Sequence, residues 1–502
     1  MSKALIVTHG NDLEFLNIVL NIVEEYRNLG ITPEILNMST IVKRQDAYSR
    51  SILKLARCDG PETWVLQYLS ESGVIVHDAN DYIDRKGAVF PSSKIEDSVD
   101  ESIRSTLISK FGNEHPVQNW KYHRLSKFFK LEAQLTFSAV VNMVFANGPY
   151  EQISVVNGRF PYQRAVQQAA NYLQIRSMSF ERGTYDHSLE PGLSTRDRYL
   201  KSKNYWHEDF PTTNRLIRQE RILSRFQRGD SGFNLTNPES WLGERRTPLG
   251  RGNQFNENWN NSFAASEDSK KRFVSLFTSS LDEFAELGPE WKEAKWKNQW
   301  EAFEYLIPIF FELGFEVILR VHPNLRNKHK TERIAVREIL RDFQQKFSYL
   351  RVLGSSSSVD SYYLVENAAA VIVWNSTIGL ESSLMGTPTA CLSSCEYDLI
   401  ADVRRWLCKE DVNVTNLLES AIDISRAGVF ISGMYLFDRP LSQLLSRTQL
   451  NLESYGRGLP LLANRWAFRG NNRVINLVSI LLPRKVLFAV RKKMRKLPLY
   501  KR

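Results

Sequence analysis

The sequence predicts an α/β protein made of two domains, each built on a mostly parallel, doubly wound sheet. In two separate stretches of the chain, short apolar segments alternate with amphipathic ones, which is typical of strands that alternate with helices. Between them, residues 229–270 are rich in Gly, Asn, Ser and Arg and predict a linker or a long active-site loop. In such domains ligands gather at the carboxyl ends of the strands, so we expect a cleft there.

The first stretch opens with a strand followed by a helix. Residues 4–8 (ALIVT) form a short apolar run, and residues 12–29 carry apolar side chains at helical spacing. Within residues 40–130 only 73–77 is typical of a strand, and the rest is expected to be polar helix or loop. Residues 190–228 are expected to be mostly helical. The clearer elements are a helix at 135–144, a strand at 153–156, a helix at 162–173 and a strand at 176–180.

The second stretch alternates more regularly. Strands are expected at 273–277, 316–321, 349–353, 370–374 and 388–392, and helices at 296–313, 330–346, 361–367 and 378–385. The predicted organisation is therefore an N-terminal domain (1–228), a polar linker (229–270), a C-terminal domain (271–480) and a basic tail (481–502).

Composition limits the class of protein. Of the 502 residues 42% are hydrophobic and 11% aromatic, which supplies more than one core and excludes disorder of the whole chain. No apolar run approaches the ~18–20 residues of a membrane span, and the start lacks a basic region followed by an apolar one, so we expect no secretory signal. Four cysteines in a chain of this length are not a disulfide framework, and we expect a reducing, cytoplasmic setting.

The net charge of +10 belongs to the tail. Nine of the 66 basic residues lie between Arg484 and Arg502 without any acidic residue, which leaves 57 basic against 56 acidic residues elsewhere. Apolar residues at helical spacing over 474–490 precede them, so we expect a basic amphipathic helix that binds an anionic membrane surface at the inner face of the cell membrane. The alternative is a solvated helix packed on the N-terminal domain. The nearly neutral remainder argues against nucleic-acid binding.

The most informative segment follows the fourth expected strand of the second stretch. Asn375 opens the run NSTIGLE, in which Ser376 and Thr377 could cap a helix or bond a phosphate oxygen. Gly379 would let a ligand approach the backbone, and Glu381 could accept hydrogen bonds from ribose hydroxyls. The alternative is an ordinary helix cap with a first-turn glutamate, which stabilises a helix by ~1 kcal/mol.

Three other expected strands also end in polar residues. His322 follows one of them, and its imidazole could donate a hydrogen bond to a phosphate. Thr278, Ser279 and Ser280 follow another, where a capping box is the alternative, and a serine run at 355–358 follows a third. Because the carboxyl ends of parallel strands share one edge of a sheet, we expect the four exits to line one ligand site.

These residues resemble a known family. The run HPN…SSSSVDSYYLVENAAAVIVWNSTIGLESSLMGTP, starting at His322, resembles the donor-binding half of capsular polysaccharide biosynthesis proteins. Those are glycosyltransferases of the two-Rossmann (GT-B) type related to the capsule Kdo transferases. LFTSSLDE (276–283) and VVNGR…FERG (155–183) fit the same pattern, and the resemblance covers about residues 150–400. It implies two Rossmann-like domains facing a cleft, to which this chain adds its basic C-terminal helical tail.

The resemblance also implies an activity: transfer of a sugar from a nucleotide-activated donor to a surface or capsular polysaccharide or a lipid-linked acceptor. A CMP- or UDP-linked sugar is the expected donor, and no metal and no further cofactor are expected. His322, Ser376 and Thr377 would hold the donor phosphate, Glu381 the ribose, and Thr278, Ser279 and Ser280 the phosphate or base. Asn157, Arg159 and Glu181 of the N-terminal domain would face the cleft, where the acceptor binds.

The carboxylate that assists the reaction stays open at this point. Glu181 or Asp12 could deprotonate the acceptor hydroxyl or assist the sugar cation, and His9 is a third candidate at the exit of the first strand. Each has a structural alternative: Asp12 as a helix N-cap, Glu181 as a salt-bridged carboxylate and His9 as a turn residue.

The sequence departs from the resemblance in two ways. The pair of glutamates separated by seven intervening residues in many retaining GT-B enzymes is absent, since Val373 stands where the first would be before Glu381, and so is the Asp/Glu-Asp-Gly motif of bacterial sialyltransferases. A dinucleotide fingerprint fails at Phe255, and no zinc spacing accompanies Cys391 and Cys395. The alternatives are a GT-B-like UDP-sugar 2-epimerase, a polyol-phosphate transferase, and a glycan-binding protein without turnover at the membrane surface.

Overall fold

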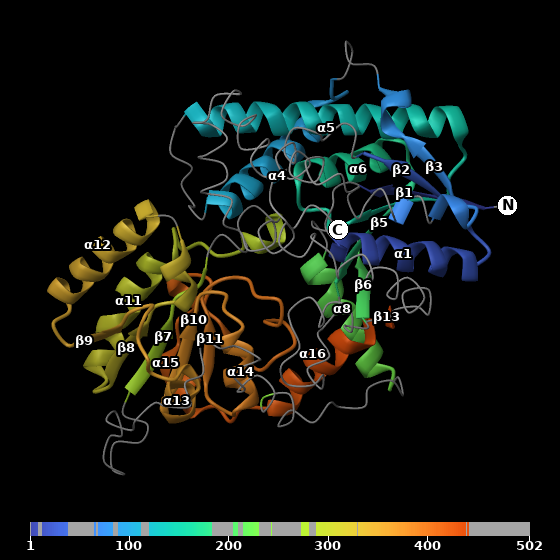
Figure 1. Cartoon of the computed structure of the whole chain (residues 1–502). Helices are drawn as coiled ribbons and strands as arrows, with labels where there is room; N and C mark the ends of the chain where they lie inside the picture. Colours follow the sequence, from blue (N-terminus) through green and yellow to red (C-terminus); the bar gives the residue numbers. More distant parts are fainter. Residues whose placement is uncertain are drawn as a thin grey trace, which may run out of the picture.

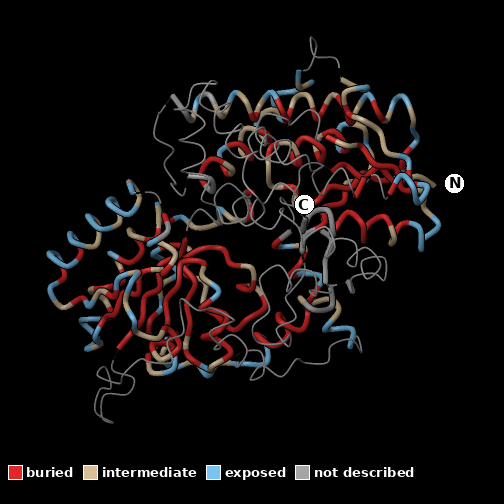
Figure 2. Tube along the Cα trace, in the orientation of Figure 1, coloured by how far each residue is buried: buried red, intermediate tan, exposed pale blue. Residues whose placement is uncertain are grey.

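The computed structural model describes residues 2–8, 13–38, 65–66, 69–83, 89–111, 120–182, 204–208, 214–229, 242, 273–280, 288–328, 330–437 and 439–440. These residues form two sheets flanked by helices (Figure 1). Figure 2 shows the buried residues gathered around each sheet. We call residues 2–208 the first half and residues 273–419 the second half.

The first sheet has seven strands in the order β13-β6-β5-β4-β1-β2-β3. Its strands β1 to β5 run parallel, whereas β6 is antiparallel to both of its neighbours. The strands are β1 (Lys3–Thr8), β2 (Thr32–Asn37), β3 (Ile75–Asp78), β4 (Gln152–Val156), β5 (Arg176–Arg182), β6 (Asn204–Glu208) and β13 (Arg439–Pro440). The helices of this part are α1 (Leu13–Asn28), the 3₁₀ turn η1 (Ala79–Tyr82), α4 (Ser93–Phe111), α5 (Trp120–Asn147), α6 (Pro161–Tyr172) and α8 (Asn214–Gln227).

The sequence of strand β1 is apolar from Ala4 to Val7 because both faces of the sheet are covered. Leu5 and Val7 belong to the core that α4, α5 and α6 build on one face of the sheet, and Ala4 and Ile6 belong to the core built with α1 on the other. Successive side chains of a strand point to opposite faces, so a strand that is covered on both sides alternates between two apolar cores.

The second sheet has six parallel strands in the order β12-β11-β10-β7-β8-β9. Counted along the chain, this is the doubly wound order 6-5-4-1-2-3. The strands are β7 (Phe273–Phe277), β8 (Glu316–Arg320), β9 (Leu350–Leu353), β10 (Ala370–Val373), β11 (Thr389–Cys391) and β12 (Arg404–Arg405). The helices are η4 (Pro289–Trp291), α11 (Gln299–Glu312), η5 (Pro323–Asn327), α12 (Lys330–Lys346), α13 (Ser361–Asn367), α14 (Ile378–Leu384), η6 (Lys409–Asp411), α15 (Val414–Glu419) and α16 (Ile424–Phe437).

Both faces of this sheet are also covered. Val274 and Leu276 of β7 share a core with residues of α11, α12 and α15, whereas Phe273 and Phe277 share one with residues of α13, α14 and α16. The continuous apolar sequence of the strands therefore has the same cause as in the first sheet.

The chain returns to the first sheet after the second. Helix α16 packs against α8, α14 and β6, and β13 pairs with β6 at the edge of the first sheet (Figure 1). The second half is thus inserted in the chain between two segments that both contribute strands to the first sheet. The predicted domain boundaries stay predictions, and they do not include this return.

The α/β class with two doubly wound, Rossmann-like sheets is confirmed. The helices at 330–346 and 361–367 lie where the periodicity predicts them. The prediction that residues 190–228 are mostly helical is wrong for 204–208, which form β6, because an antiparallel strand near the end of a sheet does not need an apolar run. Among the described helices none is long and apolar enough to cross a bilayer. The tail at 481–502 lies outside the described residues.

Candidate functional site

The second sheet has its topological switch point between β7 and β10. These strands are neighbours, but the connections that follow them lead to opposite sides of the sheet, so the loops at their carboxyl ends diverge. The residues that line this divergence are Thr278, Ser279 and Ser280 after β7 and Asn375 after β10, and all four are buried.

Hydrogen bonds join three strand exits at this edge. The amide of His322 donates to Thr278 Oγ1 over 2.8 Å, and the amide of Asn375 donates to Ser279 Oγ over 3.1 Å. The amide of Ser279 in turn donates to Gln299 Oε1 over 2.9 Å, at the start of α11. The structure therefore brings together residues that the sequence places in separate segments, and both hydroxyls keep a proton to donate.

Asn375 has a group that this framework does not use. Its side chain is 6% exposed, and its Oδ1 has no hydrogen-bond partner among the described residues. A buried polar atom without a partner costs about 1–3 kcal/mol, and native proteins keep few of them. An acceptor of this kind at a switch point is suited to a donor group on a ligand.

His322 is held by its own loop. Its Nδ1 accepts a hydrogen bond from the amide of Asn324 over 3.2 Å and thereby caps η5. The neutral ring therefore carries its proton on Nε2, which makes Nε2–H a donor. The capping role is what the structure shows, and the contact with a donor phosphate stays a prediction.

The exit of β9 lies at the same edge. Arg320 is 2% exposed, and its guanidinium donates to the backbone oxygens of Gly354 at 2.7 Å and Ser357 at 3.3 Å. Burial lowers the pKa of Arg320 to about 10, and Asp360 partly offsets that effect. The serine run at 355–358 is thus tied to the exit of β8.

The segment after β10 differs from the expectation at Gly379. A Cβ at this position would lie within 3.0 Å of Tyr397 Oη and of Val373 Cγ2. The Tyr397 hydroxyl donates to the backbone oxygen of Ser376 over 2.6 Å, so the glycine makes room for a tyrosine that fixes the loop. Close packing within the protein therefore accounts for Gly379 without a ligand.

Helix α14 is short, and its N-terminus is weakly capped. Helix α14 has seven residues, and Thr377 stands at its N-cap without a side-chain cap bond, whereas Ser376 Oγ accepts a 3.4 Å bond from the amide of Ile378. A helix of two turns offers little macrodipole to an anion, so side chains and loop amides would have to carry a phosphate site. Glu381 is 1% exposed, and protein atoms enclose it in this conformation. Its contact with a ribose stays a prediction.

The first sheet has its own switch point between β1 and β4. Asn157 and Gly158 leave β4 with φ values of 69° and 70°, and Asn157 Oδ1 accepts a 3.0 Å bond from the amide of Arg159. Arg159 Nε donates to Ser105 Oγ of α4 over 2.8 Å. The side chain of Arg159 is therefore partly engaged within the first half.

The predicted catalytic residues are described least. Residue 181 lies in β5 opposite Trp206 of β6, but the Glu181 side chain lies outside what the structure describes. His9 and Asp12 also lie outside the described residues. Their proposed roles stay predictions. The described residues contain no group of three or more His, Cys, Asp or Glu side chains that could hold a metal ion.

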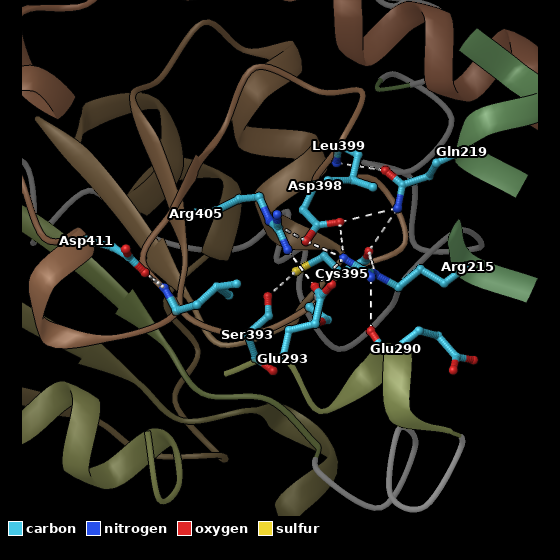
Figure 3. Close-up of polar contacts among 12 residues, drawn as sticks. Arg215, Gln219, Glu290, Glu293, Ser393, Cys395, Asp398, Leu399, Arg405 and Asp411 are labelled. Atoms are coloured by element: carbon cyan, nitrogen blue, oxygen red, sulfur yellow. Dashed lines mark hydrogen bonds and ion pairs between the residues drawn. The ribbon is translucent and has the colours of Figure 1, made fainter. Parts of the chain in front are cut away.

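A buried network that the sequence does not reveal fastens α8 to the second half. Nη2 of Arg215 lies 2.8 and 2.7 Å from the two carboxylate oxygens of Asp398, and both side chains are fully buried (Figure 3). Arg405 donates to Asp398 over 3.1 Å, and Gln219 accepts a bond from the amide of Leu399. The network belongs to the frame around the site, since its members satisfy one another.

A second cluster connects helices α4 and α6 of the first half with the segment around η4 of the second. Arg164 of α6, Glu101 of α4 and Lys292 after η4 form it with Glu290, and Lys292 Nζ lies 3.2 Å from Glu101 Oε1. No local pattern marks Glu290 or Arg164 in the sequence, because the two lie far apart along the chain.

The fold and this site define the protein as one of two Rossmann-like halves, joined by the ion pair of Lys292 and Glu101. No protein-family model matches the chain, and no curated protein sequence matches it. Among solved structures, the β-Kdo 2,4-transferase KpsC of Thermosulfurimonas dismutans is similar, with 12% identity and a TM-score of 0.34 over 58% of this chain and 81% of that one.

UDP-GlcNAc 2-epimerase from Neisseria meningitidis, bound to UDP-GlcNAc, is 14% identical, with a TM-score of 0.28 over 86% of this chain and 99% of that one. The N-terminal domain of Candida albicans trehalose-6-phosphate phosphatase is 9% identical, with a TM-score of 0.35 over 90% and 97%. The structural neighbours thus include Kdo transferases and UDP-GlcNAc 2-epimerases. With TM-scores of this size, none of them shows what this chain does.

Proposed function

We propose that this protein is a metal-independent glycosyltransferase that moves a sugar from a CMP- or UDP-linked donor to a surface or capsular polysaccharide or a lipid-linked acceptor. The observation that carries the proposal is the Oδ1 of Asn375 at the switch point of the second sheet. This atom is buried and has no hydrogen-bond partner among the described residues. A ribose hydroxyl or a base N–H would give this atom its missing hydrogen bond.

The neighbours of Asn375 complement the other part of a nucleotide. Thr278 and Ser279 each accept a backbone amide bond and keep a hydroxyl proton, and His322 carries a donor on Nε2. Donors of this kind suit phosphate oxygens. One acceptor beside three donors is the arrangement expected for a nucleoside mono- or diphosphate.

In this proposal the first half binds the second substrate, the acceptor. Its switch-point loop carries Asn157 and Arg159, and the Glu101–Lys292 ion pair connects the two halves close to that loop. An acceptor bound at the exit of β4 would therefore meet a donor bound at the exit of β7 and β10. Attachment to the inner face of the membrane through Arg484–Arg502 is part of the proposal and depends on sequence alone.

The test is a thermal-shift panel of CMP, CDP, UDP, GDP and their sugars. A ligand at about 100 times its dissociation constant stabilises the folded protein by about 2.7 kcal/mol. We expect one nucleotide class to raise the Tm of the wild type and to lose most of this effect in Asn375→Ala. The matched control is Asn367→Ala, because Asn367 bonds the carbonyl of Tyr363 at the end of α13, next to the start of β10.

Two results would count against the proposal. Absence of any shift at millimolar concentration would remove the donor site, and equal losses in both variants would mean that Asn375 acts only on stability. Conversion of a UDP-sugar to its 2-epimer without any acceptor would favour the epimerase alternative instead.

A further inference from the structure

Glu290 carries a buried carboxylate for which the fold provides no hydrogen-bond partner among the described residues. It lies in η4, between β7 and α11 in the order of the chain. The residue is 6% exposed, and neither of its carboxylate oxygens has a hydrogen-bond partner among the described residues. Figure 3 shows the side chain extending away from the network of Arg215, which bonds the backbone oxygen of Glu290 at 2.9 Å.

Gly288 leaves room for the carboxylate where it stands. A Cβ at position 288 would lie within 3.0 Å of both carboxylate oxygens of Glu290, so a larger residue there would require this side chain to shift. A side chain positioned this closely, yet without a hydrogen bond among the described residues, is costly unless another group joins it.

Arg164 presents the complementary donor from the first half. It is 1% exposed, its Nε donates to the oxygen of Gly158 over 3.4 Å, and its Nη1 donates to Ser98 Oγ over 3.0 Å. Its Nη2 has no partner among the described residues. Glu101 connects the two across the halves: its Oε2 lies 3.9 Å from Arg164 Nη1, and its Oε1 lies 3.2 Å from Nζ of Lys292, two residues after Glu290.

A hydroxyl group is the chemical group that matches this pair. It donates its proton to a carboxylate and accepts a hydrogen bond from a guanidinium, whereas a phosphate would be repelled by the carboxylate. Arg164 bonds Gly158 at the exit of β4, and Glu290 belongs to the segment that follows Ser279 and Ser280 along the chain. Under the proposed function, an acceptor bound at the exit of β4 and a donor bound at the exit of β7 would meet between these two segments.

We propose that Glu290 is the base that deprotonates the acceptor hydroxyl and that Arg164 orients this hydroxyl; the inference rests on the proposed function. In the step, the proton moves to a carboxylate oxygen of Glu290 and the hydroxyl oxygen bonds to the anomeric carbon. The bond from that carbon to the phosphate oxygen breaks, and its electron pair leaves with the nucleotide. Glu290 thus replaces Glu181, Asp12 and His9 as the preferred residue for this role.

The protonation of Glu290 suits the task. Burial raises its pKa from 4.5 to about 7, although its own backbone amide, Arg215 of α8 and Arg164 of α6 lower it and Glu101 of α4 raises it. Glu293 and Lys292 follow on the same segment and are engaged with Arg215 and Glu101. A base with a pKa near the working pH is the most effective.

The experiment uses the full chain and the nucleotide sugar that gives the largest thermal shift. Release of free nucleotide is followed with water as the acceptor, which needs no knowledge of the natural glycan. We compare wild type with Glu290→Gln, with Glu290→Asp and with the control Glu304→Gln, whose carboxylate pairs with Lys346 on the surface. Nucleotide-induced Tm shifts are measured on the same samples.

We expect kcat of Glu290→Gln to fall about 100-fold or more. The rise of the wild-type rate through an apparent pKa near 7 should disappear, while the nucleotide-induced Tm shift stays unchanged. In a further variant, Glu290→Ala, added formate should restore part of the rate. A merely structural role of Glu290 would not allow this rescue. Arg164→Lys should lose about tenfold, and an unchanged rate would remove Arg164 from the proposal.

Other outcomes separate the two proposals. A Glu290→Gln protein with wild-type rate and pH profile overturns the role of Glu290 and leaves the donor site standing. A wild type that binds a nucleotide sugar but neither hydrolyses nor transfers it overturns this inference as well. A wild type that binds no nucleotide sugar fails the proposed function itself.

Discussion

The amide of Asn375 donates a hydrogen bond to Ser279 Oγ over 3.1 Å, and this bond joins the two strand exits on either side of the switch point. Ser279 follows β7 and Asn375 follows β10, so a side chain from one loop fixes the backbone of the other. The same loops diverge immediately afterwards, which leaves the Oδ1 of Asn375 at the fork.

Ser279→Ala should therefore act on both stability and binding. Loss of the hydroxyl leaves the buried amide of Asn375 without its acceptor, and we expect unfolding to become easier by about 1–3 kcal/mol in urea titrations. Nucleotide affinity should fall about tenfold in the same variant. Ser420→Ala is the control, since that exposed hydroxyl bonds a carbonyl of the helix that it follows and should change neither quantity.

Gly379→Ala tests whether packing or a ligand accounts for the glycine. The new methyl group would overlap Tyr397 Oη and Val373, so we expect a loss of about 1–3 kcal/mol without any ligand present. Adding Tyr397→Phe should recover part of this loss, because it removes the overlapping oxygen. An unchanged stability of Gly379→Ala would contradict the packing explanation. Gly354→Ala has open space around it and serves as the control.

Asp398→Asn should destabilise the protein strongly. Arg215 would stay fully buried with a neutral amide in place of its buried carboxylate partner and would keep only the part-exposed Glu293 at 3.2 Å, and removal of one partner of a buried ion pair costs about 3–5 kcal/mol. The exposed pair of Arg341 and Asp342 gives the comparison, since Asp342→Asn should change stability by less than about 1 kcal/mol. Chemical denaturation of both variants measures the contrast, and similar values would show that the buried pair contributes little.

Stability should decline with rising pH because of Glu290. Its pKa is raised from 4.5 to about 7 in the folded protein, so between these values the native state binds more protons than the unfolded one. The contribution of this carboxyl is therefore full below pH 4.5 and is lost as the pH rises through about 7. Glu290→Gln should lack this decline and be more stable than wild type at about pH 8. Parallel pH profiles of the two proteins would refute the shift.

The tail should bind vesicles through charge. Substituting the nine basic residues between Arg484 and Arg502 by Gln should abolish co-sedimentation with vesicles containing phosphatidylserine, because each basic residue near such a surface contributes about 1 kcal/mol. Wild-type binding should also weaken between about 50 and 300 mM salt, because salt screens the attraction. Equal binding to vesicles of phosphatidylcholine alone would speak against an electrostatic tail.

The sequence reveals the strands of the second sheet because both faces are covered. A strand such as β10, AVIV, must be apolar at every position, and the polar residue that ends the run marks the sheet edge. This is why the sequence alone is enough to place Thr278, His322 and Asn375 together. It does not reveal helix α4, although Ile95, Val99, Ile103 and Leu107 recur every four residues, because the other positions of this helix are mostly polar.

The remaining site residues could not be predicted, for a physical reason. Arg215 and Asp398 pair over 183 residues, and the charged groups that act on Glu290 come from helices α4, α6 and α8, which lie far from it along the chain. Whether a charged residue is buried depends on such distant partners, and a polar helix such as α8 has the same composition whether its arginines face water or protein. Local periodicity carries no information on that choice.

The pairing of β13 with β6 bears on how the chain acquires its structure during synthesis. The ribosome releases the second half, from residue 273 onward, before Arg439 and Pro440 emerge to join the edge of the first sheet. Domains generally fold in the order in which they are made. The first sheet, however, lacks its edge strand β13 until after the second half has been synthesised. Nascent chains that stop before residue 439 should thus expose β6 as a free strand to chaperones or to other copies.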